Sequence, residues 1–108
     1  MTPDPPIEIT RESRGAWTLV RVKGDVDLAT APRLEELSES CSGPLALDLA
    51  RVRFMDSSGL RALLHLHEVR EGFVIVEPSG VVKRLFALTK MSAIFTIVDG
   101  LEALESVT

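Results

Sequence analysis

Cysteine and aromatic residues are scarce in this sequence of 108 residues, which has one cysteine, one tryptophan and no tyrosine. A single cysteine cannot form an intramolecular disulfide, so we expect Cys41 to be a reduced thiol of a cytoplasmic protein, buried as a small core residue. The aromatic side chains are not spaced for stacking on bases, and the net charge of −4 comes from scattered acidic and basic residues. This argues against nucleic acid as a direct partner, because nucleic-acid binders concentrate Lys and Arg on one face.

Long apolar runs are also missing. No run approaches the roughly 20 residues that a transmembrane helix needs, and residues 1–6, Met-Thr-Pro-Asp-Pro-Pro, lack the positive and apolar regions of a secretory signal. We therefore expect no membrane span, a flexible segment at 1–6 and a single domain at 7–108. With 45% hydrophobic residues, a domain of this size can form an ordinary core.

The sequence offers no evident metal or cofactor site. His65 and His67 are two positions apart in a predicted helix, so their side chains point to different sides and cannot hold a metal together as an i, i+4 pair could. We expect both histidines to be structural, and we expect no metal, no cofactor and no catalytic residue.

Hydrophobic periodicity divides the chain into alternating strands and helices. Predicted strands cover residues 7–12, 16–23 (ended by Gly24), 45–54, 73–76 and 94–98. Predicted helices run from an N-cap at Thr30, with Pro32 in the first turn, to the break at Gly43-Pro44, over 59–70, from Pro78-Ser79-Gly80 onward, and over 100–107. The first helix should bury Leu34, Leu37 and Cys41, and the third helix should bury Val81, Val82, Leu85, Phe86 and Leu88.

This order, ββαβαβαβα, predicts an α/β fold: a mixed, mostly parallel sheet of about five strands with about four helices packed on it. Strand 73–76 is a continuous apolar run and should be covered on both faces. Asp48 lies opposite the leucines of its strand, where its side chain can accept from local backbone donors. Met55 is expected to fill a gap in the core.

The turn Asp56-Ser57-Ser58-Gly59 places two serines where a strand ends and a helix begins. Up to four backbone N–H groups lack partners at a helix N-terminus, and the helix dipole favours negative charge there. Such a position accepts a phosphate, and Gly59 removes a side chain that could crowd it. The same four residues are equally those of an ordinary helix cap, so the turn alone does not assign a function.

A resemblance over roughly residues 7–105 adds to this. Phe54-Met55-Asp56-Ser57-Ser58-Gly59-Leu60 resembles the phosphorylation-site motif of the STAS-domain anti-sigma factor antagonists (anti-anti-sigma factors). Three further segments resemble other parts of the family: Gly24–Ala31, Leu45–Leu49 and Val82–Phe86. One departure is Lys90, which stands where family members often have a glycine that closes the third helix; if that position is left-handed, lysine costs about 1 kcal/mol relative to glycine.

The resemblance implies a binding module, with no enzymatic activity, that regulates transcription by partner switching. Ser57 would be phosphorylated by an anti-sigma factor that is itself a serine kinase. The unphosphorylated protein would bind that kinase and release a sigma factor, phosphorylation would end the binding, and a serine phosphatase would reset the switch. The implied partner-binding residues are Asp27, Asp56, Ser57, Ser58, Gly59 and Leu60, on a chain expected to be monomeric.

Several assignments stay open at this stage. Ser58 is either the helix cap, which we favour, or the phosphate acceptor, and Asp27 either lies beside the acceptor or caps the next helix. Leu66 and Val69 are partner contacts or core residues. The main alternative function is a STAS module that is never phosphorylated, acting as a scaffold in a sensory complex or as a subunit of a lipid-transport system.

Two enzymatic or signalling alternatives fail on sequence. A serine hydrolase needs a Gly-x-Ser-x-Gly elbow, and neither Ser57 nor Ser58 has glycines at both flanking positions. A receiver domain needs acidic residues at the end of its first strand to hold magnesium, and Asp48, the candidate acceptor, lies too early in its own strand.

Overall fold

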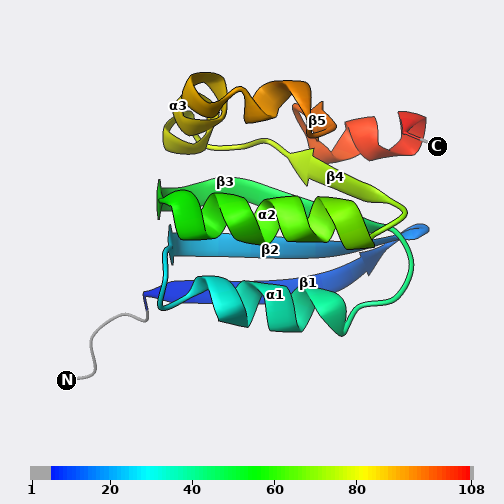
Figure 1. Cartoon of the computed structure of the whole chain (residues 1–108). Coiled ribbons are helices and arrows are strands. Elements are labelled where there is room, and N and C mark those ends of the chain that lie inside the picture. Colours follow the sequence, from blue (N-terminus) through cyan, green and yellow to red (C-terminus); the bar gives the residue numbers. More distant parts are fainter. Residues whose placement is uncertain (1–5, 108) are drawn as a thin grey trace.

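In the computed structural model, which describes residues 6–107, five strands form one sheet with helices on it (Figure 1). The strands are β1 (Ile7–Arg14), β2 (Trp17–Val26), β3 (Leu45–Met55), β4 (Phe73–Val76) and β5 (Ile97–Val98). The helices are α1 (Ala31–Glu39), α2 (Ser57–Val69) and α3 (Gly80–Thr89), with 3-10 helices η1 (Met91–Ala93) and η2 (Leu101–Ser106).

The strands lie in sequence order, β1-β2-β3-β4-β5, so each new strand is added on the same side of the last one. β1 is antiparallel to β2, and the other pairs are parallel. Right-handed crossovers that always advance in one direction place their helices on one face of the sheet. Figure 1 shows α1 and α2 side by side on that face, which we call the inner face. The predicted mixed, mostly parallel α/β fold is confirmed.

The core has two unequal parts. The large inner cluster packs α1, α2 and α3 on the sheet, with Leu47, Leu63 and Phe86 among its members. The small outer cluster, on the opposite face, packs η2 against Leu19, Ala46, Val74 and Val76 through Leu104. All four residues of β4 are buried, as the apolar run predicted. Because η2 covers only part of the outer face, the rest of that face is open.

Several predicted boundaries were wrong. β2 does not end at Gly24 but continues to Val26. Gly24 allows this because it adopts φ +111° and packs closely on the backbone of Pro6. A Cβ on Gly24 would lie 2.4 Å from the carbonyl oxygen of Pro6. Pro6 accepts a hydrogen bond from the Asp25 N–H at 2.8 Å. Residues 1–5 of the segment predicted to be flexible lie outside the described residues.

The burial predictions for the helices also needed correction. Cys41 is buried, as expected, but it lies beyond the end of α1 rather than on its apolar stripe. On α3, Val82 and Phe86 are buried, whereas Val81 and Leu88 are exposed, so the apolar side is narrower than predicted. β5 has only two residues instead of the expected 94–98, because the N–H groups of Ile94 and Phe95 both donate to the Met91 carbonyl and continue the turn of η1.

Lys90 closes α3 in the left-handed conformation, with φ +63°. This is the condition under which its substitution for glycine was expected to cost about 1 kcal/mol. No helix in residues 6–107 combines the length and the apolar character required to cross a bilayer.

Candidate functional site

The candidate site lies at the edge of the sheet where the parallel strands β2 and β3 both end. Val26 and Met55, their last residues, are paired, and the Asp56 N–H donates to the Val26 carbonyl at 3.3 Å. The two loops that follow, from Asp27 and from Asp56, are therefore neighbours. The carboxyl ends of parallel strands are the usual place for binding residues in such sheets.

Asp56 is the N-cap of α2. Its Oδ1 accepts from the Ser58 N–H at 2.8 Å and from the Gly59 N–H at 3.3 Å, while its backbone is extended. The prediction that Ser58 is the cap was therefore wrong: Ser58 lies inside the first turn, where its own N–H is capped. The cap also starts α2 at Ser57, two residues earlier than predicted.

Ser57, the first residue of α2, is exposed to solvent. Its neighbours Asp56 and Ser58 are half-buried, whereas Gly59 and Leu60 are buried against the sheet. Of the four residues in the turn, Ser57 thus presents the most accessible hydroxyl. Met55, directly before the turn, is buried in the core as predicted.

Gly59 has a different role from the predicted one. A Cβ at this position would lie 2.6 Å from Cγ of Met55, 2.9 Å from the carbonyl oxygen of Val26 and 3.0 Å from its Cγ1. The absence of a side chain thus lets α2 pack closely on the ends of β2 and β3. The Cβ position of Gly59 points toward the core and not toward the place of a phosphate on Ser57.

The Asp27 loop is held by a hydrogen-bond network of its own. Asp27 Oδ1 accepts from the N–H groups of Ala29 at 3.0 Å and Thr30 at 3.2 Å. The buried Thr30 hydroxyl donates to the Asp25 carbonyl at 2.7 Å and accepts from the Asp27 N–H at 2.9 Å. Thr30 occupies the N-cap position of α1, as predicted, but makes no side-chain cap bond. The carboxylate of Asp27 orders this turn, and it also lies on the loop next to Asp56.

These networks limit what a phosphate could bind within the molecule. The amides of Ser58 and Gly59, which the sequence suggested were free, are occupied by Asp56. A phosphate on Ser57 would gain the favourable helix dipole, about 0.3–2 kcal/mol, but would stand beside a carboxylate that already holds the amides. The added charge would therefore face solvent.

Two large apolar side chains are exposed beside these loops. Leu28, in the loop after β2, is 78% exposed, and Phe54, two residues before the cap, is 47% exposed. Phe54 is paired with Asp25 across β2 and β3, so it lies at the same sheet edge. Neither exposure was predicted, because it depends on how each residue is placed relative to the elements that cover the sheet.

The histidines are engaged away from Ser57. His65 Nε2 lies 3.1 Å from Oε1 of Glu39, linking α2 to α1, and the His67 ring packs edge-on against Phe95 with centroids 5.8 Å apart. Leu66 is fully buried and belongs to the core, whereas Val69 is 55% exposed. Among residues 6–107, no three His, Cys, Asp or Glu side chains are grouped so as to hold a metal ion.

The other end of α2 carries a feature that the sequence analysis missed. The guanidinium of Arg70, the C-cap residue, donates to the carbonyls of Ser38 at 3.0 Å, Cys41 at 2.7 Å and Gly43 at 2.6 Å. These bonds fasten the turn between α1 and β3 to the end of α2. Asp48 on β3 accepts from the Ala50 N–H at 2.9 Å, as its predicted role required.

The comparisons with known proteins agree with this architecture. The family model described as STAS domain matches residues 8–104, nearly the whole chain. Among solved structures, an anti-sigma factor antagonist from Mycobacterium paratuberculosis is 27% identical, with a TM-score of 0.84, and the match covers 98% of this chain and 96% of that one.

Two more distant structures, both of proteins called SpoIIAA, share the fold. The anti-sigma factor antagonist SpoIIAA in its unphosphorylated form is 20% identical, with a TM-score of 0.72 over 93% of this chain and 96% of that one. The Bacillus cell fate determinant SpoIIAA in the phosphorylated form is 18% identical, with a TM-score of 0.66 over 94% of this chain and 100% of that one.

Proposed function

The chain belongs to the STAS domain family, and from this premise we propose that it is an anti-sigma factor antagonist switched by phosphorylation of Ser57. In its unphosphorylated form it binds an anti-sigma factor that is also a serine kinase, and so frees a sigma factor in the cytoplasm. Phosphorylation ends the binding, and a serine phosphatase restores it. The protein acts by binding and not by catalysis.

The observation that carries the proposal is the exposed Ser57 hydroxyl at the first position of α2. A kinase must reach the hydroxyl that it phosphorylates. The neighbours Asp56 and Ser58 are half-buried, whereas Ser57 is exposed. Ser58, the other candidate acceptor, is half-buried and its N–H is already bound by Asp56. The nearest histidine in sequence, His65, lies about 12 Å further along the helix by its rise per residue, so it is not placed to activate Ser57 as a nucleophile.

Electrostatics supply the switch. A phosphate on Ser57 adds about −1.5 to −2 charges next to Asp56 and near the loop of Asp27. At about 6 Å and an effective dielectric near 20, each pair of unit charges interacts with about 3 kcal/mol. Repulsion of this size from an acidic or desolvated partner surface weakens binding about a hundredfold or more, since about 1.4 kcal/mol is tenfold. The fold itself stays intact, because the phosphate faces solvent.

The surface that docks the partner is centred on Ser57 and includes Asp27, Asp56 and Ser58, with Gly59 and Leu60 positioning the turn from below. Leu28 and Phe54 add exposed apolar area at the same edge. A few large side chains around an accessible polar centre are typical of binding hot spots. A phosphate placed among them would require desolvation of its charge on docking, which adds to the repulsion.

The decisive experiment incubates the protein with an anti-sigma kinase of the same organism and ATP, and maps the modified residue by mass spectrometry. We expect one phosphate, on Ser57. Ser57→Ala should remove the labelling and keep the binding, whereas Ser57→Asp should weaken binding at least tenfold. Ser58→Ala is the matched control and should be labelled like the wild type.

A second measurement tests the docking surface. Leu28→Ser and Phe54→Ser should each weaken kinase binding about tenfold without a loss of stability, because both side chains are exposed. Val69→Ser, at the opposite end of α2 and with an exposure between those of Phe54 and Leu28, should leave binding unchanged. Labelling of Ser58 alone would disprove the assignment of the acceptor. Binding that persists without labelling would favour a STAS scaffold in a sensory or lipid-transport complex.

A further inference from the structure

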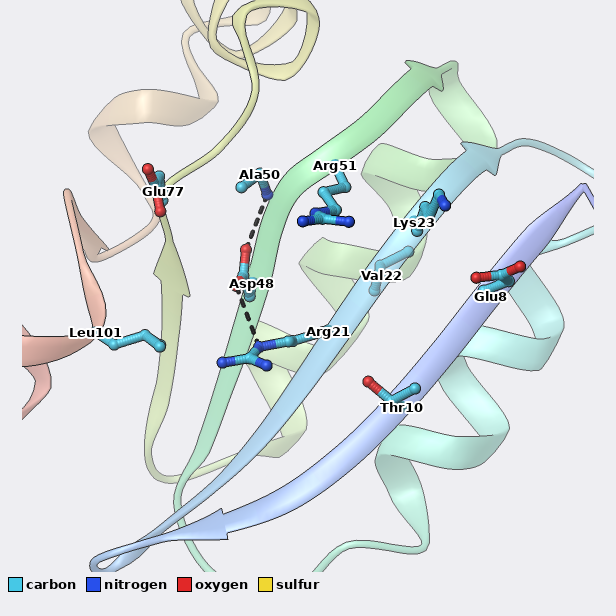
Figure 2. Close-up of a pocket in the computed structure, with 10 residues that line it drawn as sticks. All are labelled: Glu8, Thr10, Arg21, Val22, Lys23, Asp48, Ala50, Arg51, Glu77 and Leu101. Carbon is cyan, nitrogen blue, oxygen red and sulfur yellow. Dashed lines mark hydrogen bonds and ion pairs between the residues drawn. The ribbon is translucent and has the colours of Figure 1, made fainter.

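The outer face of the sheet carries a second concave site, away from the Ser57 edge. Parallel strands are normally covered on both faces, yet beyond η2 the outer side of β2 and β3 is open. A cavity of about 560 Å³ lies there between β1 and the segment after β4. Figure 2 shows its polar lining, which lies on neighbouring strands and just after β4: Glu8, Thr10, Arg21, Lys23, Asp48, Arg51 and Glu77.

A bulge in β3 shapes this lining. Arg21 is paired with Asp48, whereas Lys23, two residues on, is paired with Arg51, three residues on. A regular ladder would place Ala50 opposite Lys23. The extra residue brings Arg51 to the outer face beside Lys23, and such bulges often redirect a side chain next to a functional site.

The pairing of Lys23 with Arg51 is electrostatically unfavourable in the free protein. Like charges directly opposite each other on neighbouring strands destabilise a sheet. Arg21 is occupied by Glu12 at 3.2 Å and by Asp48 at 3.7 Å, and Asp48 in turn accepts from the Ala50 N–H. Within residues 6–107, neither Lys23 nor Arg51 forms an ion pair. A bound anion would relieve this repulsion.

We propose that the cavity binds a small phosphate ester that also carries hydroxyl groups, of the sugar phosphate class. The planar guanidinium of Arg51 can donate two parallel hydrogen bonds to a phosphate, and Lys23 supplies a second charge to match a dianion. Glu8 on one side and Glu77 on the other can accept hydrogen bonds from hydroxyl groups. The volume fits a small ligand, and among residues 6–107 no aromatic side chain lines the cavity for a nucleobase to stack on.

This site is independent of the proposed phosphorylation switch, because it uses other residues on the other face of the sheet. The test is an NMR titration of the intact protein with inorganic phosphate, ribose 5-phosphate and ribose at matched ionic strength. We expect shifts centred on Lys23 and Arg51, with ribose 5-phosphate binding more tightly than phosphate and ribose not binding. A Kd of about 1 mM or tighter is the range a small anion would reach here.

Charge variants sharpen the test. Arg51→Gln should weaken phosphate binding at least tenfold and Lys23→Gln about fivefold, whereas Glu8→Gln, which removes a neighbouring negative charge, should strengthen it about twofold. Lys83→Gln, on the exposed side of α3, is the matched control and should bind like the wild type. Absence of shifts at about 10 mM phosphate, or equal shifts at all exposed cations, would overturn the proposal. So would binding that survives Arg51→Gln.

Discussion

At the amino end of α2 the Asp56 carboxylate accepts two backbone N–H groups, and at the carboxyl end the Arg70 guanidinium donates to three carbonyls. The Arg70 bonds join the end of α2 to the end of α1 and the turn after it, whereas the Asp56 bonds stay within one turn. Beside Asp56, the Ser57 side chain is left exposed. The carboxyl end of α2 thus uses its polar side chain to connect distant parts of the fold. The amino end leaves the Ser57 hydroxyl exposed to solvent. Substitutions at Arg70, Asp56 and Ser57 test this contrast, and one at Ser38 tests the end of α1 to which Arg70 is bonded.

The largest effect is expected at Arg70. Arg70→Met removes three charge-assisted hydrogen bonds and leaves the carbonyls of Ser38, Cys41 and Gly43 without this donor, so we expect a loss of about 3 kcal/mol in the free energy of unfolding. The melting temperature should fall by about 15 °C in a thermal scan. Arg70→Lys keeps the positive charge but lacks the planar guanidinium, so it should restore only part of the lost free energy of unfolding. A change below about 0.5 kcal/mol would show that the clamp does not stabilise the fold.

The cap at the other end should matter less. Asp56→Ala should cost about 1.5 kcal/mol in urea denaturation, because the Ser58 and Gly59 amides lose their acceptor. Asp56→Asn retains an acceptor and should stay within about 0.5 kcal/mol of the wild type. Equal losses for the two variants would indicate that the charge, and not the cap, stabilises α2.

A third substitution should raise stability. The Ser38 hydroxyl is fully buried on α1 and, in the part of the chain described, has no hydrogen-bond partner. Ser38→Ala should therefore stabilise the protein by about 1 kcal/mol, since it removes a buried unpaired group and favours the helix. The control is Ser40→Ala, which removes an exposed hydroxyl bonded to the Leu37 carbonyl and should not stabilise. If Ser38→Ala lowered the free energy of unfolding, the conclusion that the Ser38 hydroxyl is unpaired would be contradicted.

The smallest effect belongs to Ser57. Ser57→Ala should change the free energy of unfolding by less than about 0.5 kcal/mol, because the exposed hydroxyl makes no contact that holds the fold. Urea denaturation of the two proteins, side by side, measures this. A loss comparable to that of Asp56→Ala would mean that Ser57 is a structural residue, and the contrast between the two helix ends would fail.

Much of the fold follows from local patterns in the sequence. The run Phe73–Val76 was predicted with its observed bounds, since four consecutive apolar residues between Gly72 and Pro78 suit only a short covered strand. The two faces of β2 follow the alternation of its side chains: Val20 and Val22 lie in the inner cluster and Leu19 lies in the outer one. Such assignments need only the period of the side chains.

The remaining features depend on contacts between distant segments. The choice of Asp56 over Ser58 as cap depends on which residue is extended when α2 meets the sheet, and the role of Gly59 depends on the backbone of Val26. Arg70 reaches carbonyls about thirty positions away, which no local pattern reveals. The bulge that brings Arg51 beside Lys23 is likewise visible only in the pairing of β2 with β3.

The antiparallel start of the sheet has a practical consequence for anyone who labels this protein. Ile7 is paired with Gly24, so the described chain enters at the edge where β2 ends and Ser57 stands. It leaves from η2 at the opposite end of the sheet (Figure 1). A fluorophore or affinity tag attached ahead of Pro6 would emerge beside the proposed docking surface around Ser57, whereas one attached after Val107 would lie away from it.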